Sequence, residues 1–331
     1  MHRRNRLFRS LAISVAAVTV LALTSCSASD DEGNPSDEEP VSIVFIGDSS
    51  ASDPVWSFRV QALQEEAEVA GADFTFQFAS GDFAKQAQLM QQAVAGGADA
   101  IIAPLWDENL FVQPVVDAHA AGVAVYGLMG MAPKDGLPAE VQDAVGWDDI
   151  DLVEWGEKIG EVSLEHVPDG GTVMWPAEVP SATYITQAIE GFQNYFGENG
   201  KTVKIEVVET TNDATTATSR IAAYLTSHPD TAAVITSGAI AADSAAVAEQ
   251  QMGLEPGAVP VIGQVVSPNA AAAIQSGIMA VGLNIDDVQA TKDAVADVIA
   301  ITRGEKAQHR QVSYLVITAG NIEETVPAAL R

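Results

Sequence analysis

Short apolar runs alternate with amphipathic stretches along the chain from residue 41 onward. The runs fit strands that are buried on both faces of a parallel sheet. Between them, apolar residues recur at helical spacing, as in Phe83, Ala87 and Met90. This rhythm predicts parallel sheets covered by helices, with strands at 41–46, 74–78, 100–103, 123–126, 172–175, 203–208, 232–235 and 259–262.

The first of these units indicates where a ligand would lie. The run 41–46 is followed by a small polar loop that ends at Asp53, and Pro54 suits the first turn of the next helix. Open α/β sheets bind ligands at the carboxyl ends of their strands. We therefore expect this loop to line a binding cleft.

The length of the chain and an internal repeat both predict two lobes. A chain of 331 residues exceeds the usual size of a single hydrophobic core. Asp82 and Asp99 are 17 residues apart in the sequence, as are Asp213 and Asp230. Each pair brackets a predicted loop, helix, turn and strand. The two halves are therefore expected to share one design.

Tryptophan is scarce in this chain, and four of its five tryptophans lie at or just beyond predicted strand ends: Trp56, Trp106, Trp147 and Trp175. An indole suits stacking on a flat, weakly polar ligand, although core packing is the alternative for each of them. Trp155 follows a helical pattern and is assigned to the core. Trp106 and Ser237 hold matching positions in the two halves, so we expect them to face the cleft from opposite sides.

The N-terminal residues have the layout of a secretory signal. A basic start precedes an apolar segment over 11–23, and residues 1–25 are predicted to form a signal peptide. The motif Leu23-Thr24-Ser25-Cys26 resembles a bacterial lipobox, in which the cysteine is lipidated; an ordinary cleavage site beside a chance cysteine is the alternative. Residues 26–40 contain six acids and no base, which predicts a disordered tether. We expect an extracytoplasmic protein anchored to the outer face of the cell membrane through Cys26.

Charge and motifs exclude several classes of function. After removal of four arginines with the signal, 12 basic residues remain against 45 acidic ones, a net charge of −33, which argues against nucleic acid as a partner. The five histidines are scattered, and no metalloprotease or phosphate-loop motif occurs. The cluster of Asp148, Asp149 and Asp151 could suggest a cation site. It lacks the alternating acidic spacing of a calcium-binding loop, so an acidic helix start is the preferred interpretation. We expect neither an enzyme nor a bound cofactor or metal.

Several short motifs together resemble the sugar-type periplasmic binding proteins, the ribose- and galactose-binding group that serves ABC importers. The resemblance covers about residues 41–304 and rests on the segments Asp53-Pro54-Val55-Trp56, Gly96-Gly97-Ala98-Asp99-Ala100-Ile101-Ile102, Gly122-Val123-Ala124-Val125-Tyr126, Val145-Gly146-Trp147-Asp148-Asp149, Glu190-Gly191-Phe192, His228-Pro229-Asp230 and Gln275-Ser276-Gly277. Regulators of the lac-repressor type share these lobes, but they carry a DNA-binding segment where this chain has a secretory signal.

The resemblance implies an α/β fold of two Rossmann-like lobes with parallel sheets, joined by a three-crossover hinge. It places the crossings near Trp147, Asn284 and Ser313. Lobe 1 would then comprise 41–147 plus 285–313, and lobe 2 would comprise 148–284 plus 314–331. The family also implies a monomer that closes on its ligand.

The chain departs from this group at the residues that grip a sugar. Leu128-Met129-Gly130 stands where the family has an Asp-Arg pair, and Gly238-Ala239 stands near its Asn-Asp pair, whereas Asn284 remains at the second crossing. Most charge-assisted hydrogen bonds to a pyranose are therefore absent from the pattern. The candidate ligand-binding residues are Asp53, Trp56, Trp106, Asp107, Trp147, Asp148, Trp175, Ser237, Gln264 and Asn284.

These features predict a lipid-anchored solute-binding protein. It would capture a small neutral or weakly polar solute, such as a sugar, polyol or nucleoside, and deliver it to the permease of an ABC importer with its ATPase. The alternative is a surface sensor of the same fold that presents the bound ligand to a membrane signalling receptor.

Overall fold

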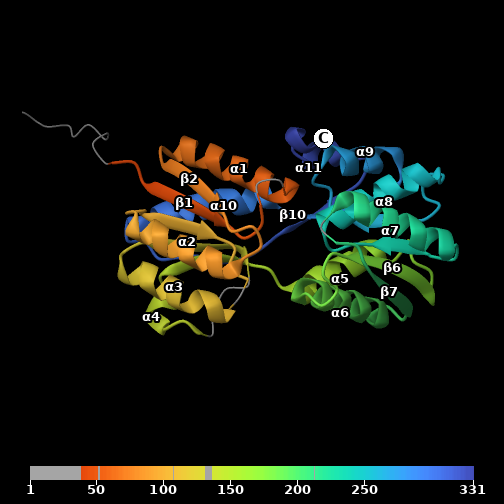
Figure 1. Cartoon of the computed structure of the whole chain (residues 1–331), viewed down its shortest axis with the longest axis horizontal. Coiled ribbons are helices and arrows are strands. Elements are labelled where there is room, and N and C mark those ends of the chain that lie inside the picture. The colour runs from red at the N-terminus through yellow and green to blue at the C-terminus, as the bar shows by residue number, and fades with distance from the viewer. Residues whose placement is uncertain (1–38, 51–52, 107, 131–135, 212) are drawn as a thin grey trace, which may run out of the picture. The chain divides into compact units, whose positions relative to one another are not determined.

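Two six-stranded sheets carry the described part of the chain in this computed structural model, which covers residues 39–50, 53–106, 108–130, 136–211 and 213–331 (Figure 1). The first sheet has the order β11-β5-β4-β3-β1-β2, and its recorded strand pairs are parallel. Its strands are β1 (Ser42–Gly47), β2 (Asp73–Phe78), β3 (Ala100–Ala103), β4 (Ala124–Gly130), β5 (Val145–Asp149) and β11 (His309–Gln311).

The second sheet repeats this order as β12-β10-β9-β8-β6-β7. Its pairs are parallel except that between β10 and β12, which is antiparallel. Its strands are β6 (Gly171–Ala177), β7 (Val203–Glu209), β8 (Ala233–Ile235), β9 (Val261–Gly263), β10 (Met279–Ile285) and β12 (Tyr314–Ile317). The predicted α/β fold is confirmed, although the apolar pattern alone did not identify β5, β10, β11 and β12.

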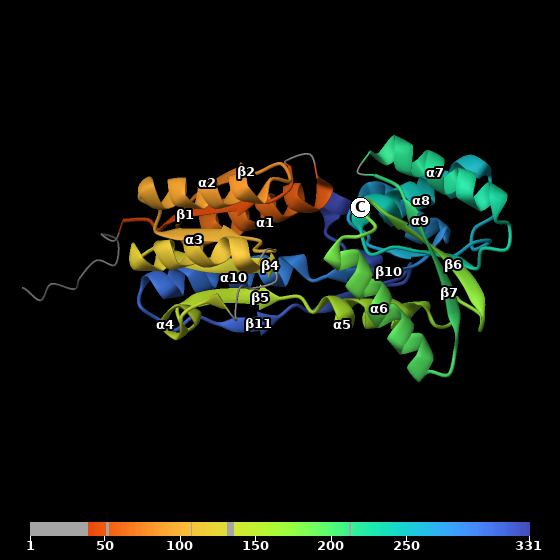
Figure 2. The ribbon, with the colours of Figure 1, turned by 60° about the horizontal axis from the view of Figure 1, so that its bottom comes forward.

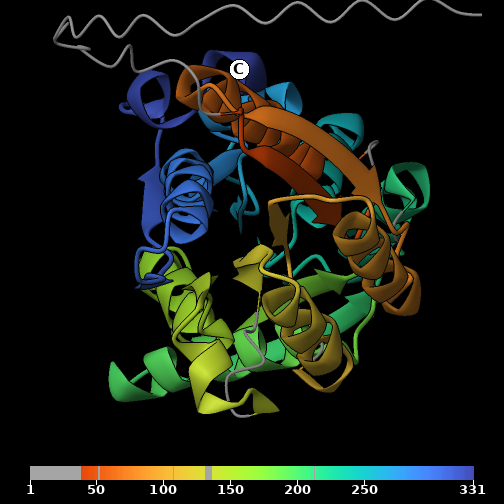
Figure 3. The same ribbon diagram turned by 90° about the vertical axis from the view of Figure 1, so that its left-hand side faces the viewer.

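Helices cover both faces of each sheet because successive strand residues point to opposite sides. In β1, Ile43 and Phe45 pack with α1 (Pro54–Ala70) and α10 (Asp287–Thr302), whereas Val44 and Ile46 pack with α2 (Phe83–Ala95) and α3 (Glu108–Ala120). Figure 3 shows α1 in orange and α10 in blue. The remaining helices are α4 (Ala139–Gln142), α5 (Leu152–Ser163), α6 (Thr183–Glu198), α7 (Ala214–Ser227), α8 (Ala239–Met252), α9 (Pro268–Ser276) and α11 (Ile322–Thr325), followed by a 3-10 turn at Ala328–Leu330.

The chain passes from one sheet to the other three times. It crosses between β5 and α5, between β10 and α10, and between β11 and β12, as Figure 2 allows the reader to follow. Trp147 and Asn284, which the resemblance placed at crossings, lie within β5 and β10 a few residues before the chain leaves each strand. Ser313 lies directly between β11 and β12.

The internal repeat is confirmed at the level of the backbone. Asp82 and Asp213 cap α2 and α7, where their carboxylates accept hydrogen bonds from the N–H groups of Lys85 at 2.9 Å and Thr216 at 2.8 Å. Two residues before each cap, Ser80 and Thr211 adopt left-handed conformations with φ of 61° and 67°. The turns after β2 and β7 therefore share an aspartate cap and a left-handed residue two positions before it.

Two glycines allow α5 and α6 to pack closely. A Cβ atom on Gly156 would lie 2.1 Å from the carbonyl oxygen of Ala188, and one on Gly191 would lie 1.9 Å from that of Val153. Neither distance leaves room for a methyl group, so the contact requires glycine at both positions.

Candidate ligand-binding site

The loop after β1 places two carboxylates at the end of the first sheet. Asp53 caps α1: its side chain accepts hydrogen bonds from the Val55 N–H at 3.0 Å and from the Ser49 hydroxyl at 3.1 Å. Asp48, which the sequence analysis missed, has one buried oxygen without a hydrogen-bond partner among the described residues. Burial raises the pKa of Asp48 to about 6, with Arg59 opposing the shift and Asp53 adding to it.

Trp56 lies in the first turn of α1 with only 6% of its surface exposed. Its ring lies 5.8 Å from that of Phe45, and the guanidinium carbon of Arg59 lies 4.5 Å from its centre, within the range of a cation–π contact. The Nε of Arg59 donates to Asp287 at 2.8 Å, in an ion pair that is buried on both sides. A cation therefore already covers one face of this indole.

The residue after β6 provides a third carboxylate, which the sequence analysis also missed. Glu178 is 9% exposed and accepts a hydrogen bond from the Tyr184 hydroxyl at 3.2 Å. A Cβ on Gly238 would lie 2.9 Å from a Glu178 oxygen, so glycine here leaves room for the carboxylate at the start of α8. Burial raises the pKa of Glu178, and Asp53 raises it further. Because Asp53 affects the pKa of Glu178, the loop after β1 and the end of β6 lie within electrostatic reach of each other.

The loops after β8 and β9 differ in how much hydrogen-bonding capacity they leave free. Ser237 is 7% exposed, and its hydroxyl has no hydrogen-bond partner among the described residues. Asn284, by contrast, accepts from the Val265 N–H at 2.7 Å and donates to the Val265 carbonyl at 2.8 Å. Asn284 therefore holds the loop that carries Gln264, a half-buried residue. Whether Ser237, Gln264 and Asn284 touch a ligand stays a prediction.

Comparison with known proteins supports a binding function for this arrangement. The profile described as "Periplasmic binding protein domain" matches residues 43–306, most of the chain. The chain belongs to the periplasmic binding protein family. This confirms the resemblance seen in its motifs.

The solved structures similar to this periplasmic binding protein share its fold. The myo-inositol binding protein of Caulobacter, bound to myo-inositol, superposes with a TM-score of 0.74 at 22% identity, over 87% of this chain and 97% of that one. The glucose-galactose binding protein GanP of Geobacillus stearothermophilus gives 0.71 at 17% identity, over 86% and 99%. Among curated proteins, the xylose/arabinose-binding protein XylF of Sulfolobus acidocaldarius is 29% identical over 145 residues, which are 43% of this chain and 35% of that relative.

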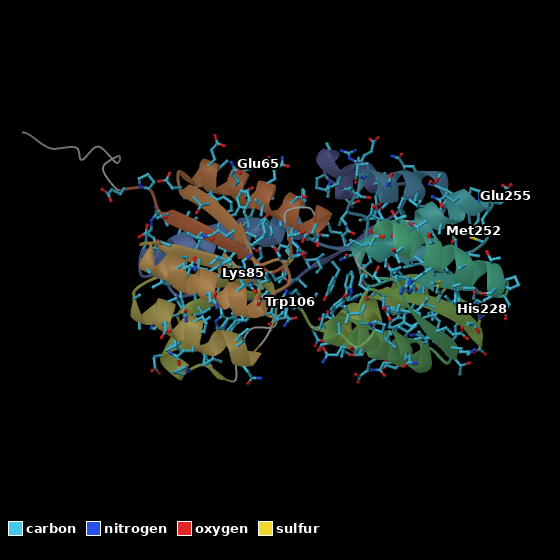
Figure 4. The ribbon with its side chains drawn as sticks, in the orientation of Figure 1. Glu65, Lys85, Trp106, His228, Met252 and Glu255 are labelled. Carbon is cyan, nitrogen blue, oxygen red and sulfur yellow. The ribbon has the colours of Figure 1, made fainter. Side chains whose placement is uncertain are left out.

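The other predicted tryptophans of this binding protein have different surroundings. Trp106 is half-buried after β3 and packs at the edge of the core, and Figure 4 labels it at the ends of the strands. Trp147 is 4% exposed and stacks on His309 with 4.1 Å between ring centres. Trp175 is fully buried against Phe192. Trp147 and Trp175 pack inside the cores of their lobes. Their role in ligand binding stays a prediction, and none of their contacts with the described residues supports it.

The predicted acidic residues also differ in their surroundings. Asp148 is buried in the first lobe, and its pKa is raised to about 6 by burial, with Tyr126 and Arg310 opposing the shift. Asp151 caps α5 by accepting from the Val153 N–H at 2.9 Å, which confirms the acidic helix start. Asp107 lies outside the described residues. Within the part of the chain that the structure describes, no group of acids and histidines could hold a metal ion.

None of the helices in the described ranges is long and apolar enough to cross a bilayer. Cys26 and the predicted signal and tether lie within residues 1–38, outside the described residues.

Proposed function

We propose that this periplasmic binding protein captures a small polyhydroxylated or weakly polar solute at the facing strand ends of its two sheets and delivers it to the permease of an ABC importer. The observation that carries the proposal is the position of the Glu178 carboxylate, which is buried, directly follows β6, and has its pKa raised by burial and further by Asp53 in the loop after β1. Groups from the strand ends of both sheets are therefore expected to meet the same ligand. Relatives that bind xylose, arabinose and myo-inositol support a ligand with several hydroxyl groups.

The aromatic and polar groups at this site suit such a solute. Trp56 and Trp106 provide apolar surface for the ring face of a polyol or nucleoside. The carboxylates of Asp48 and Glu178 accept hydrogen bonds from hydroxyl groups, and charge-assisted bonds of this kind are strong. The sequence pattern predicts a cleft with few charged groups, and Asp48 and Glu178 add two carboxylates to it.

A thermal-shift screen of the full-length protein over sugars, polyols, nucleosides and small aromatics tests the proposal. A ligand that binds only the folded state raises the melting temperature by mass action. Hits are titrated calorimetrically, and small-angle scattering with and without saturating ligand checks for closure of a monomer. A screen without any shift, or a ligand that leaves the scattering profile unchanged, would contradict the proposal.

Uptake separates delivery from sensing. Deletion of the gene should abolish accumulation of the labelled ligand if the protein serves an importer. Unimpaired uptake combined with a lost transcriptional response to the ligand would instead identify the protein as a surface sensor.

The anchor is proposed from the motif Leu23-Thr24-Ser25-Cys26 and the acidic segment after it. Cys26→Ala should release the protein into the soluble fraction or stall its processing, while ligand binding persists. Recovery of the variant in membranes at the wild-type level with normal processing would refute lipidation.

A further inference from the structure

Carboxylates lie at the proposed site, and among the described residues no ion pair joins Asp48, Asp53 or Glu178 to a cation. Asp48 and Asp53 follow β1, Glu178 follows β6, and the charge of Asp53 acts on both of the others. The cation that acts on Asp48 is Arg59, whose guanidinium is already committed to Asp287 at 2.8 Å and to the ring of Trp56. The Glu178 carboxylate is stabilised by backbone N–H groups and the Tyr184 hydroxyl. The site therefore has an excess of negative charge.

Two buried polar atoms at the proposed site, one of them a carboxylate oxygen, have unused hydrogen-bonding capacity among the described residues. One oxygen of Asp48 and the hydroxyl of Ser237 are shielded from solvent and find no partner among the described residues. Ser237 is more than nine-tenths buried and directly precedes Gly238, which lies against the Glu178 carboxylate. Buried polar groups are normally paired, so these atoms indicate where ligand groups would be received. A carboxylate oxygen can only accept, and the ligand must therefore donate to Asp48.

We propose that the ligand of this cleft carries a protonated amine in addition to hydroxyl groups, as an amino sugar or an aminopolyol does. This inference rests on the proposed function and specifies the class of solute. An ammonium group offers three donors and no acceptor, which matches a site whose charged groups are carboxylates. Its positive charge also offsets the repulsion between Asp53 and its two neighbours. A neutral polyol could donate to the same oxygens but would leave that repulsion uncompensated.

The ionisation of Asp48 adds a dependence on pH. Burial raises its pKa to about 6, Asp53 in the same loop adds to the shift, and the backbone N–H groups of Ser49 and Asp48 and the charge of Arg59 on α1 oppose it. Below pH 6 the carboxyl gains a proton, and the attraction for an ammonium group falls. Preference for the amine should therefore be larger at pH 7.5 than at pH 5.5.

Matched pairs of ligands test the inference on the full-length protein. D-glucosamine is compared with D-glucose, D-galactosamine with D-galactose, and 1-amino-1-deoxy-D-glucitol with D-glucitol, each by calorimetric titration at pH 7.5 and 5.5. In at least one pair the amine should bind at least tenfold more tightly at pH 7.5, and its advantage should shrink at pH 5.5 and in high salt.

Variants show whether the preference comes from this site. Glu178→Gln should reduce the ratio of the two affinities to below threefold, and Asp48→Asn provides a second test if the first variant folds poorly. The matched control is Glu255→Gln, which removes the same charge from an exposed residue beyond the end of α8 (Figure 4). The length of α8, about 20 Å at 1.5 Å per residue, separates Glu255 from Ser237. The control should keep the wild-type ratio.

The outcomes separate this inference from the proposed function. If uncharged sugars, polyols or nucleosides bind and no amine binds more tightly than its neutral partner, the inference is wrong and the proposed function stands. A preference that persists in both Glu178→Gln and Asp48→Asn would also overturn it. If neither these pairs nor the wider solute panel binds, the proposed function fails, and the inference fails with it.

Discussion

Glu249 is a buried carboxyl group without a compensating partner among the described residues, and its replacement by glutamine should stabilise the protein. The residue is 1% exposed on the inner side of α8, beside Ala245, Ala246 and Ala248. Neither of its oxygens has a hydrogen-bond partner among the described residues. Burial raises the pKa of Glu249 from an ordinary value of 4.5 to about 8. The folded protein therefore keeps this carboxyl protonated at neutral pH, whereas the unfolded chain releases the proton.

The size of the effect follows from the linkage between protonation and folding. Below pH 4.5 both states are protonated, and Glu249 has no effect on the free energy of unfolding through its charge. Between pH 4.5 and 8 that free energy falls by about 1.4 kcal/mol per pH unit. The loss reaches about 3 kcal/mol at pH 7 and about 5 kcal/mol above pH 8. Glutamine has nearly the same shape and cannot ionise, so Glu249→Gln should be more stable than the wild type by about these amounts.

Urea denaturation at pH 5, 6, 7 and 8, followed by tryptophan fluorescence, measures the effect. The difference between variant and wild type should stay below about 1 kcal/mol at pH 5 and widen as the pH rises. Other raised carboxyl groups, such as Asp48 and Asp148, contribute equally to both proteins and cancel in the difference. Glu255→Gln, an exposed substitution, should show no such trend. A difference that does not change between pH 5 and 8 would refute the reasoning.

Three further substitutions test the packing that supports the site. Arg59→Met should lower the free energy of unfolding by about 3–5 kcal/mol because Asp287 is left buried and unpaired. Adding Asp287→Asn to Arg59→Met should recover part of this loss, and a double variant without any recovery would contradict the pairing. Gly191→Ala should cost about 1–3 kcal/mol or more in urea denaturation because its methyl group meets the carbonyl of Val153, and a neutral result would mean that the helices separate freely. Trp56→Ala should weaken ligand binding by about 2–4 kcal/mol in calorimetry. It should also lower the melting temperature, since the structure buries Trp56 where the sequence suggested a loop end. An unchanged dissociation constant would show that Trp56 only packs its helix.

The local pattern of the chain was enough to predict parallel sheets and eight of the twelve described strands, whereas the three crossings were implied by the family resemblance. Strands buried on both faces must be nearly continuous apolar runs, and helices that cover a sheet must be apolar on one side. Both patterns can therefore be recognised in the sequence. Short-range signals were equally reliable. Asp82, Asp213 and Asp151 were recognisable as helix starts because a cap bonds to N–H groups only two or three residues away.

The composition of the site depended on contacts that no local pattern records. Arg59 resembles an ordinary charge on a helix, and its partner Asp287 is 228 residues away in sequence. The two meet only because the second crossing returns α10 to the face of the sheet that α1 covers. Glu178 directly follows a buried strand, yet its role depends on the space that Gly238 leaves.

Tryptophan at a strand end was an ambiguous signal for a physical reason. In a sheet covered on both faces, a side chain is buried whichever way it points, so the period of two does not separate core from cleft. Trp147 and Trp175 entered the cores of their lobes, whereas Trp106 stayed half-exposed. The sequence by itself determined which segments become strands and helices, because those preferences are local. The tertiary structure alone decided which side chains meet at the strand ends, because that depends on how distant segments pack.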